Sequence, residues 1–427
     1  MLEAFLNQHI TSPSRAILTR FDVTMEPTPP DSPRRRIARP TQKFVDSVNN
    51  FGFLMQKLTM SHNRPSAVCG ISLYQLFLMA GGGGQCEDFY HALGISPDDA
   101  DEAARRIMHL DGYCKAAGAF QLSTTRSLWH QADEEPATGW PPQLADTLDV
   151  TIEELDPDAV ADLVMVDADH GLGSTRWMLL TCFSFSAEWA EPFSIHATRT
   201  AAFQTFDDEV RACAMMRRTA VMDYNADARM QVCVLPYRAD DADDPDDADD
   251  ADDAGPGSGP GTGPRPRWRA ALVLPVDADF AALAAVQARL SSPTALRALL
   301  SPATTRRPGL RPRTVDLALP RLNLWLGLDL SDAVGVADAS ARMHQAVVLN
   351  VNEFGTDMPD VASVEPQRTA ATLTPRHRFV ADRPFLFLVF DDTTKTVLCS
   401  AAVCEPTCNP AAPAPALVDP DDWVYDD

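Results

Sequence analysis

Two short apolar runs near the C-terminal end of the chain are typical of buried β-strands. Residues 346–351 read AVVLNV, and residues 384–390 read PFLFLVF. Both runs are too short for a buried helix and are rich in the branched and aromatic side chains that favour strands. The residues between them have no sustained period and are rich in Thr, Ser, Pro, Asp and Arg. A connection of that length is either functional or disordered, so the pattern predicts a long exposed loop supported by two core strands.

Helical and strand patterns are interleaved along the rest of the chain. Apolar residues fall on one helical face within residues 44–58 and again within 280–290. Alternating or short apolar runs predict strands at 120–129, 268–275 and 315–319. This mixture favours the α+β class.

Composition narrows the function classes. The 427 residues can fill one large domain or two ordinary ones, and the formal net charge of −24 disfavours nucleic acid and anionic membranes as partners. No apolar run approaches the length of a transmembrane helix. Nine cysteines, an odd number without metal-ligand spacing, predict reduced thiols. The first residues lack the basic and long apolar segments of a secretory signal, which favours a cytoplasmic location.

Three segments have compositions that cannot bury enough apolar surface to fold. Residues 1–40 are rich in Pro and Ser with a basic cluster at 34–36, which predicts a disordered tail, or alternatively a nuclear-import or docking signal. Residues 239–265 form an acidic Asp-Ala run followed by Gly-Pro repeats, which predicts a disordered insert in a hairpin turn. We interpret the insert as a solvated spacer; an acidic lure for a basic partner or a weak cation site is the alternative. Residues 407–427 predict a second disordered tail, which leaves 41–406 as the folded domain.

No catalytic, metal or cofactor motif survives inspection, so we expect a protein that is not an enzyme. The histidines do not form an H-E-x-x-H pair, and no G-x-S-x-G motif is present. The glycines at 81–84 are not followed by Lys-Ser/Thr, so they predict a flexible break and not a phosphate loop. Glu153 and Glu154 are neighbours on a predicted strand and face opposite ways, which favours solvation over acid–base chemistry.

Three motifs around the predicted loop resemble those of the serpins, the serine protease inhibitor family. Residues 351–356 read VNEFGT, similar to the family hinge V-x-E-E-G-T, and residues 379–387 read FVADRPFLF, similar to F-x-A-D-R-P-F-L-F. Residues 343–347 read MHQAV, similar to V-H-K-A-V. Weaker landmarks extend the resemblance over roughly residues 41–406 without the insert. It implies a large, mostly antiparallel sheet, further sheets, surrounding helices and an exposed reactive-centre loop at about 355–379.

The chain also departs from the family. Cys69 and Gly70 replace the first Ser-Pro of the motif that leads into a central helix, although Ser72 is kept. The region 156–177 contains the breaking run HGLG, so we predict that the helix covering the main sheet is shortened or missing. By resemblance, four residues form a structural set at the opening of the sheet: Ser72, Thr181 and His344 make a polar cluster under the opening strands, and Trp189 lies where the loop would first enter. The compositional bias suggests GC-rich coding, and the departures suit a rapidly diverging copy such as a viral one.

The resemblance implies a mechanical inhibitor. A serine protease cleaves the loop, and the loop then inserts into the main sheet and distorts the protease. The hinge comprises six residues: Glu353, Gly355, Thr356, Met358, Pro359 and Asp360. Gly355 and Thr356 suit insertion. Met358 is bulky, Pro359 has no N–H for the ladder, and Asp360 would face the core by alternation, at a cost of several kcal/mol.

Two functions therefore stay open. The first is a serine-type endopeptidase inhibitor, and the second is a non-inhibitory binding scaffold with a non-protease protein partner. Counting from the hinge places the scissile bond near Thr369, and counting back from Phe379 places it near Ala371. Arg368 predicts trypsin-like specificity unless it is simply a solvated loop arginine, and the run 369–371, with Ala370 at its centre, predicts elastase-like specificity. We expect a monomer, and the resemblance adds an extracellular location as the alternative to the cytoplasm.

Overall fold

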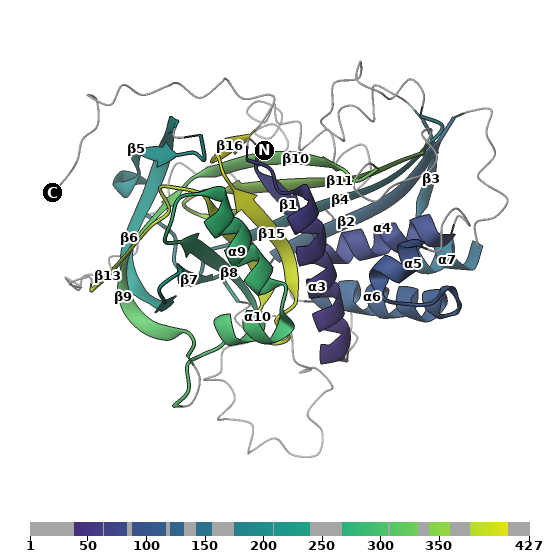
Figure 1. Ribbon diagram of the computed structural model, residues 1–427, viewed down its shortest axis with the longest axis horizontal. Coiled ribbons are helices and arrows are strands. Elements are labelled where there is room, and N and C mark those ends of the chain that lie inside the picture. The colour runs from purple at the N-terminus through teal and green to yellow at the C-terminus, as the bar shows by residue number, and fades with distance from the viewer. Residues whose placement is uncertain are drawn as a thin grey trace, which may run out of the picture.

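The computed structural model describes residues 38–62, 64–82, 88–116, 120–131, 142–155, 175–207, 209–239, 267–305, 308–331, 341–358 and 376–408. These residues form two large β-sheets with helices around them (Figure 1). Mixed α and β content with separate sheets agrees with the α+β prediction. The expected shortening of the covering helix and most of the acidic insert lie outside the described residues.

The first sheet has seven strands and carries the hinge. Its order is β16 (Thr407–Cys408), β10 (Leu322–Asp329), β11 (Ala341–Val351), β12 (Gly355–Thr356), β4 (Trp177–Glu188), β2 (Phe120–His130) and β3 (Thr151–Glu154). We call it the main sheet. At its centre β11 and β4 run parallel, with Ala341 opposite Trp177 and Val348 opposite Ser184. Beyond that pair, the two-residue strand β12 lies between them and antiparallel to both.

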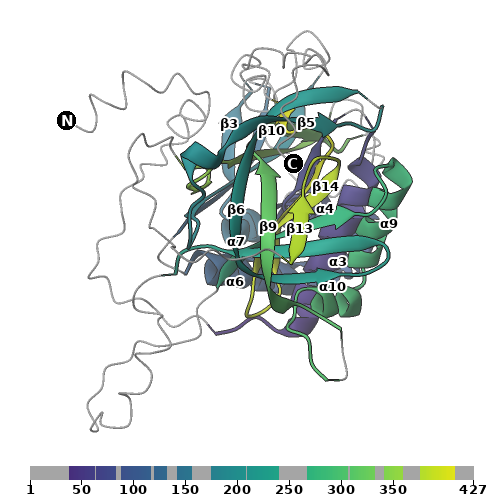
Figure 2. The same cartoon turned by 90° about the vertical axis from the view of Figure 1, so that its left-hand side faces the viewer.

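The second sheet has nine strands and forms most of the left half of the molecule in Figure 1. Its order is β1 (Ser66–Val68), β15 (Val397–Val403), β14 (Phe385–Asp391), β8 (Trp268–Pro275), β7 (Met230–Pro236), β6 (Val210–Ala226), β9 (Arg311–Pro320) and β13 (His377–Val380), and β5 (Arg199–Gln204) pairs with β6. Every residue of β14 is buried, because this strand lies between two neighbours inside the sheet. The apolar run at 384–390 is therefore the interior strand that its pattern predicted. Figure 2 shows β6, β9 and β13 side by side, facing the viewer, at the end of the strand order.

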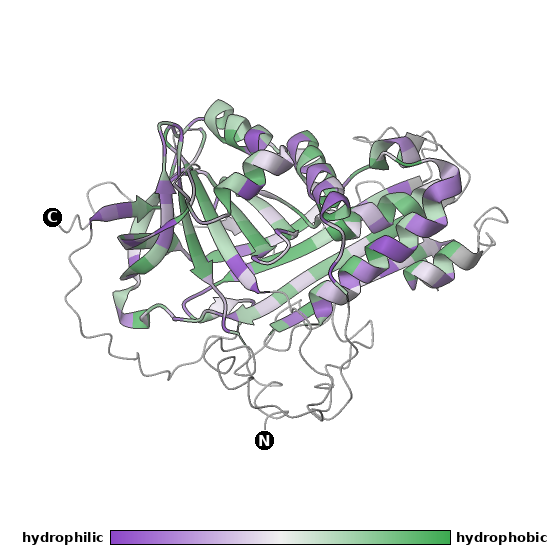
Figure 3. Cartoon of the chain, turned by 90° about the horizontal axis from the view of Figure 1, so that it is seen from below, coloured by the Kyte–Doolittle hydropathy of each residue, from purple (hydrophilic) through white to green (hydrophobic). Residues whose placement is uncertain are grey.

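The helices lie in two groups. The helices α4 (Gly70–Gly82), α5 (Asp88–Leu93), α6 (Ala100–Lys115) and α7 (Pro142–Leu148) lie beside the main sheet, and α3 (Gln42–Thr59), α9 (Phe280–Leu290) and α10 (Pro293–Leu299) lie beside the second (Figure 1). Two short 3-10 turns, 97–99 and 195–197, complete the described helical elements. In Figure 3 the hydrophobic residues follow the strands, and the helices carry hydrophilic residues on their outer faces.

The central helix α4 corrects part of one prediction. A flexible break was expected at residues 81–84, but α4 continues through Gly81 and Gly82, and residues 83 and 84 lie outside the described residues. A Cβ atom on Gly81 would lie 2.6 Å from the ring of Tyr90, so this glycine gives α5 room to pack closely against α4. The other end is similar, since a Cβ on Gly70 would lie 3.2 Å from the carbonyl oxygen of Val48 in α3. Small residues at both ends of α4 thus set its distance from its neighbours.

Candidate functional site: the hinge at the opening of the main sheet

The two residues of β12 occupy the point where β4 and β11 separate. Gly355 lies opposite Glu188, and Thr356 lies opposite both Ala187 and Val351. A Cβ atom on Gly355 would lie 2.0 Å from the carbonyl oxygen of Ala187, so only glycine fits between these backbones. Expected as hinge residues, Gly355 and Thr356 are therefore the residues that already lie in the sheet.

Thr356 is held from below by a tyrosine. Its side chain is 0% exposed, and its Oγ1 is 2.7 Å from the phenolic oxygen of Tyr237. Burial raises the pKa of Tyr237 far above its usual range, and the contact with Thr356 offsets part of that rise. The tyrosine therefore stays neutral and keeps its proton for hydrogen bonding. This polar contact gives the buried threonine hydroxyl a partner.

The chain leaves the sheet immediately after Thr356. Asp357 has a φ of 51°, a left-handed conformation that no strand contains. Its amide donates to the carbonyl of Asn350 at 2.7 Å, and Asn350 Nδ2 donates to Asp357 Oδ1 at 3.0 Å. Asn352 Nδ2 donates to the carbonyl of Met358 at 2.7 Å, and Ser186 Oγ donates to the carbonyl of Asp357 at 3.3 Å. We call Asn350, Asn352 and Ser186 the hinge clamp.

Burial raises the pKa of Asp357, and the hydrogen bond from Asn350 offsets part of that rise. This environment thus favours the neutral, protonated form of the Asp357 carboxyl group, which contacts the hinge clamp through Asn350. A left-handed Asp357 does not continue the strand, and the hydrogen bonds of the clamp hold it in that conformation. The clamp therefore stabilises the arrangement in which β12 ends at Thr356.

Glu353 anchors the chain just before β12. The side chain is 0% exposed, and its carboxylate receives hydrogen bonds from Arg321 Nε at 3.0 Å and from the hydroxyl of Thr198. Arg321 Nη2 also lies 2.8 Å from Glu353 Oε2. The backbone amide of Phe193 donates to the carbonyl of Glu353 at 2.8 Å. A buried carboxylate needs such partners, so this set fixes the point from which the hinge starts.

Trp189 lies at the hinge, next to the point where the resemblance placed the first entry of the loop. Its ring stacks on Tyr237 with centroids 4.5 Å apart and planes 11° apart. Its Nε1 donates to the carbonyl of Asn352 at 3.0 Å, and its amide donates to the carbonyl of Phe354 at 2.8 Å. Trp189 and Tyr237 together form the floor under β12. The sequence does not single out Tyr237, because its role depends on contacts between distant segments.

Under the middle of the main sheet, Gln345 takes the place expected for His344. Gln345 pairs with Thr181, and its side chain bonds the amide and carbonyl of Cys69 at 3.1 Å each. Ser72 Oγ donates to Cys69 Sγ at 3.2 Å. The polar groups between the sheet and the start of α4 are thus Ser72, Thr181, Gln345 and Cys69.

His344 points to the opposite face of β11, because neighbouring residues on a strand alternate. It pairs with Leu180, and its Nε2 lies 3.7 Å from Asp329 on β10. Burial lowers the pKa of His344, while Asp329 partly opposes that shift. The prediction from the motif at 343–347 was therefore wrong by one residue: Gln345, and not His344, faces the start of α4.

Comparison with known proteins identifies the family. The model of the family described as Serpin (serine protease inhibitor) matches residues 46–244 and 328–406, which is more than half of the chain. The chain belongs to the serpin family.

Relatives are distant. A "Serine protease inhibitor" of Cyanea capillata is 23% identical over 256 residues, 55% of this chain and 58% of its own length. "Serpin-Z2B" of Oryza sativa subsp. japonica is 26% identical over 384 residues, 81% of this chain and 92% of its own length. "Serpin-Z2" of Arabidopsis thaliana is 27% identical over 94 residues, 22% of this chain and 23% of its own length. The chain thus spans less than two thirds of the length of two of these three relatives.

Solved structures share the fold. Human thyroxine-binding globulin has a TM-score of 0.63 at 16% identity, covering 86% of this serpin and 99% of that chain. The Arabidopsis serpin AtSerpin1, in its native stressed conformation, has a TM-score of 0.60 at 16% identity, covering 86% and 99%. Identities this low show the fold alone.

Six of the predicted site residues lie outside the described part of the chain: Pro359, Asp360 and the scissile candidates at 368–371. Within the described part of this serpin, no three His, Cys, Asp or Glu side chains gather closely enough to hold a metal ion. None of the described helices combines the length and apolar character needed to cross a membrane.

Proposed function

We propose that this serpin inhibits a serine protease by presenting the segment between β12 and β13 as bait and then inserting it into the main sheet. One observation carries the proposal: β12 already lies between β4 and β11, antiparallel to both. A strand that continued β12 would form hydrogen bonds on both sides. The relatives named "Serine protease inhibitor" and, from Bos taurus, "Leukocyte elastase inhibitor" support a protease as the partner class.

The register of β12 also favours a second candidate, a non-inhibitory binding scaffold. Thr356 lies opposite Ala187 and Val351, so each two-residue step along an inserted strand moves two residues back along β4 and β11. Position 358 would then lie between Phe185 and Leu349. Continuing in the same register, position 360 would lie between two buried apolar side chains, Phe183 and Val347.

Asp360 is poorly suited to that place. Its carboxylate would need to be buried without a partner or protonated, at a cost of several kcal/mol. Pro359 would leave one ladder position without a donor. Position 362, an alanine, would instead lie between the polar pair Thr181 and Gln345. In this register Asp360 would thus not reach the polar pair Thr181 and Gln345. This mismatch slows insertion and favours cleavage of the segment without trapping of the protease.

Incubation with trypsin-like and elastase-like proteases, followed by a denaturing gel, distinguishes the two candidates. An inhibitor gives a covalent complex that survives denaturation, and mass spectrometry locates the cleaved bond within 368–371. A protease whose nucleophile is chemically blocked serves as the control, because it cannot form the acyl-enzyme. The variant Arg368→Gln separates the two specificities, since it removes trypsin-like cleavage and leaves elastase-like cleavage intact.

The inhibitor proposal is rejected if every protease of the panel cleaves the segment and none forms a complex. That result supports the scaffold, which binds a protein partner that is not a protease. The relative named "Probable non-inhibitory serpin-Z5", from Arabidopsis thaliana, supports this alternative.

A further inference from the structure

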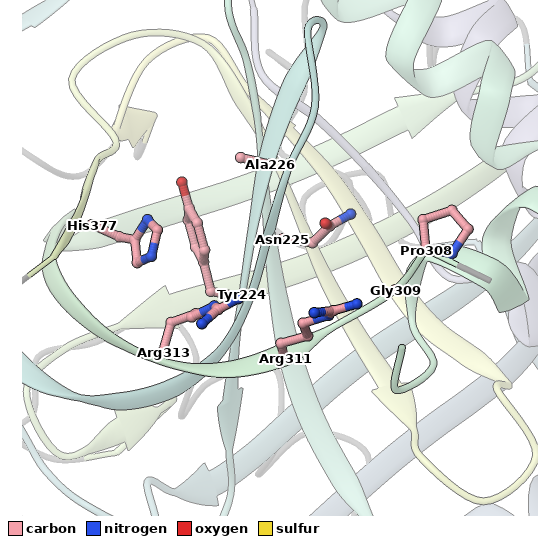
Figure 4. Close-up of a pocket in the computed structure, with 8 residues that line it drawn as sticks. All are labelled: Tyr224, Asn225, Ala226, Pro308, Gly309, Arg311, Arg313 and His377. Atoms are coloured by element: carbon pink, nitrogen blue, oxygen red, sulfur yellow. The ribbon is translucent and has the colours of Figure 1, made fainter. Parts of the chain in front are cut away.

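An open cavity of about 300 Å³ lies at the edge of the second sheet, away from the hinge. It is lined by residues from the end of β6, the loop before β9, and the first residues of β9 and β13 (Figure 4): Tyr224, Asn225, Ala226, Pro308, Gly309, Arg311, Arg313 and His377. We call it the edge pocket. Its lining contains two arginines and a histidine and no carboxylate.

Strand register explains why these side chains meet. Tyr224 on β6 lies opposite Arg311 on β9, and His377 on β13 lies opposite Val315. Alternation places Arg311 and Arg313 on the same face as Val315, whose side chain is fully buried in the core. The first part of β9 thus extends beyond the hydrophobic core, and on its core-facing side the positions before Val315 carry the guanidinium groups of Arg311 and Arg313.

The guanidinium groups of Arg311 and Arg313 have no ion-pair or hydrogen-bond partner among the described residues. The carboxylates nearest in sequence to Tyr224 are already paired elsewhere: Asp223 with Arg269 at 2.5 Å, and Asp227 with Arg289 at 2.9 Å. Asp223 lies opposite Pro312, so it faces away from the pocket. Although the chain has a net charge of −24, the lining of this pocket therefore holds two arginines and no carboxylate to neutralise them.

The walls of the pocket are fixed in place. The loop before β9 is bonded to residues 301–303, with Leu310 donating to the carbonyl of Ser301 at 2.9 Å and Ala303 donating to the carbonyl of Leu310 at 2.8 Å. A Cβ on Gly309 would lie 2.5 Å from the same carbonyl oxygen of Ser301, so this loop packs closely. On the other side, the rings of Tyr224 and His377 lie with centroids 5.0 Å apart.

We propose that the edge pocket binds a small phosphate or sulfate monoester that carries a flat ring. Arg311 and Arg313 are two residues apart on one strand, roughly 7 Å along it, so both can approach the oxygens of one phosphate or sulfate group. Guanidinium groups match the oxygen spacing of such groups better than other cations do. The Tyr224–His377 pair offers the flat surface against which a ring stacks.

The proposal is tested by calorimetric titration of the full chain with phenyl phosphate, phenyl sulfate and inorganic phosphate. We expect saturable one-to-one binding of both phenyl esters, weaker at physiological than at low ionic strength. The ester with the lower dissociation constant identifies whether phosphate or sulfate is preferred. Inorganic phosphate, which lacks the ring, is expected to bind more weakly than phenyl phosphate.

Two charge-matched double variants separate the pocket from general charge attraction. Arg311→Gln/Arg313→Gln is expected to raise the dissociation constant for phenyl phosphate by about tenfold or more. The control, Arg217→Gln/Arg378→Gln, removes two exposed arginines from β6 and β13 on the opposite face of the same sheet, and about twofold or less is expected. Unchanged melting temperatures show that both variants fold.

A third variant, His377→Leu, tests the ring-binding part. It is expected to weaken phenyl phosphate toward the level of inorganic phosphate while leaving inorganic phosphate unchanged. The proposal is overturned if no saturable binding is seen, if the two double variants weaken binding equally, or if phenyl and inorganic phosphate bind alike.

Discussion

The ion pair between Arg321 and Glu353 is the residue-scale feature with the largest predicted effect on stability. Glu353 is fully buried, whereas the side chain of Arg321 is 39% exposed. Arg321→Met would leave a buried carboxylate with Thr198 as its remaining side-chain donor, and we expect a loss of about 2–4 kcal/mol, below the upper range for such losses because Arg321 is partly hydrated. Thermal melting measures it. In the control Arg238→Met, which breaks the exposed pair with Glu188, we expect less than about 1 kcal/mol.

Substitutions at Gly355 and Thr356 test two different requirements of β12: close backbone packing at Gly355 and a side-chain hydrogen bond at Thr356. Gly355→Ala places a methyl group against the carbonyl oxygen of Ala187, so we expect β12 to leave the main sheet. Thr356→Val keeps the shape and loses only the contact with Tyr237, so we expect β12 to stay, with a loss of about 1 kcal/mol. Hydrogen exchange at the amides of 355–358 reports both. Equal protection in the wild type and Gly355→Ala would show that the sheet tolerates the methyl group.

At the scale of elements, the sequence patterns predicted the bounds of some strands and helices better than they predicted which face of a strand each residue occupies. The strand at 268–275 and the helix at 280–290 were predicted with the bounds that β8 and α9 have. Helix α6 was not predicted, although Ala103, Ile107 and Leu110 lie on its buried side at helical spacing. His344 was placed on the wrong side of β11, since a shift of one residue reverses every side chain and no local pattern reports it.

The stability of the hinge should depend on pH through Asp357, which accepts a hydrogen bond from Asn350 of the hinge clamp. Its folded-state pKa is raised from the model-compound value of 3.8, so its contribution to stability is complete below that pH and is lost as the pH rises through the folded-state pKa. Asp357→Asn keeps the side chain neutral at every pH. We therefore expect its melting temperature to exceed that of the wild type by an amount that grows as the pH rises from about 4 toward neutrality.

Melting curves across this pH range measure that difference. The exposed Asp277→Asn serves as the control, with a profile parallel to that of the wild type. A constant difference between Asp357→Asn and the wild type at all pH values would show that the Asp357 carboxyl group does not titrate within the clamp.

At the scale of the whole molecule, the family motifs predicted the fold, and the hinge could be assigned to the sheet because Gly355 and Thr356 match a specific pattern. Of the floor under the hinge, the resemblance indicated Trp189 but not its stacking partner Tyr237. Tyr237 and Trp189 come from separate strands, and their stacking depends on how β4 and β7 end next to each other. The edge pocket could not be predicted either, because Arg311 and His377 are far apart in sequence and meet only through the register of β9 and β13.

Insertion of the whole segment is the event that decides between the two proposed functions. It would separate β4 from β11 along eight paired positions, from Trp177–Ala341 to Ser184–Val348, and replace those pairs with contacts on both sides of a new strand. Pro359→Ala/Asp360→Ala removes the unpaired carboxylate and restores the missing N–H. We therefore expect more covalent complex with a cleaving protease than for the wild type.

The same variant should show a larger rise in melting temperature after cleavage of the segment. Removing a cost of several kcal/mol corresponds to a further rise of roughly 10 °C, at about 2–4 °C per kcal/mol for a large domain. The matched control is Glu365→Ala/Pro366→Ala, which also removes one proline and one carboxylate. In the register of β12, position 365 would face away from the core and position 366 would lie beside Trp177 and Ala341, the first residues of their strands. This control should behave like the wild type; if both variants respond equally, the register of β12 does not extend along the inserted segment.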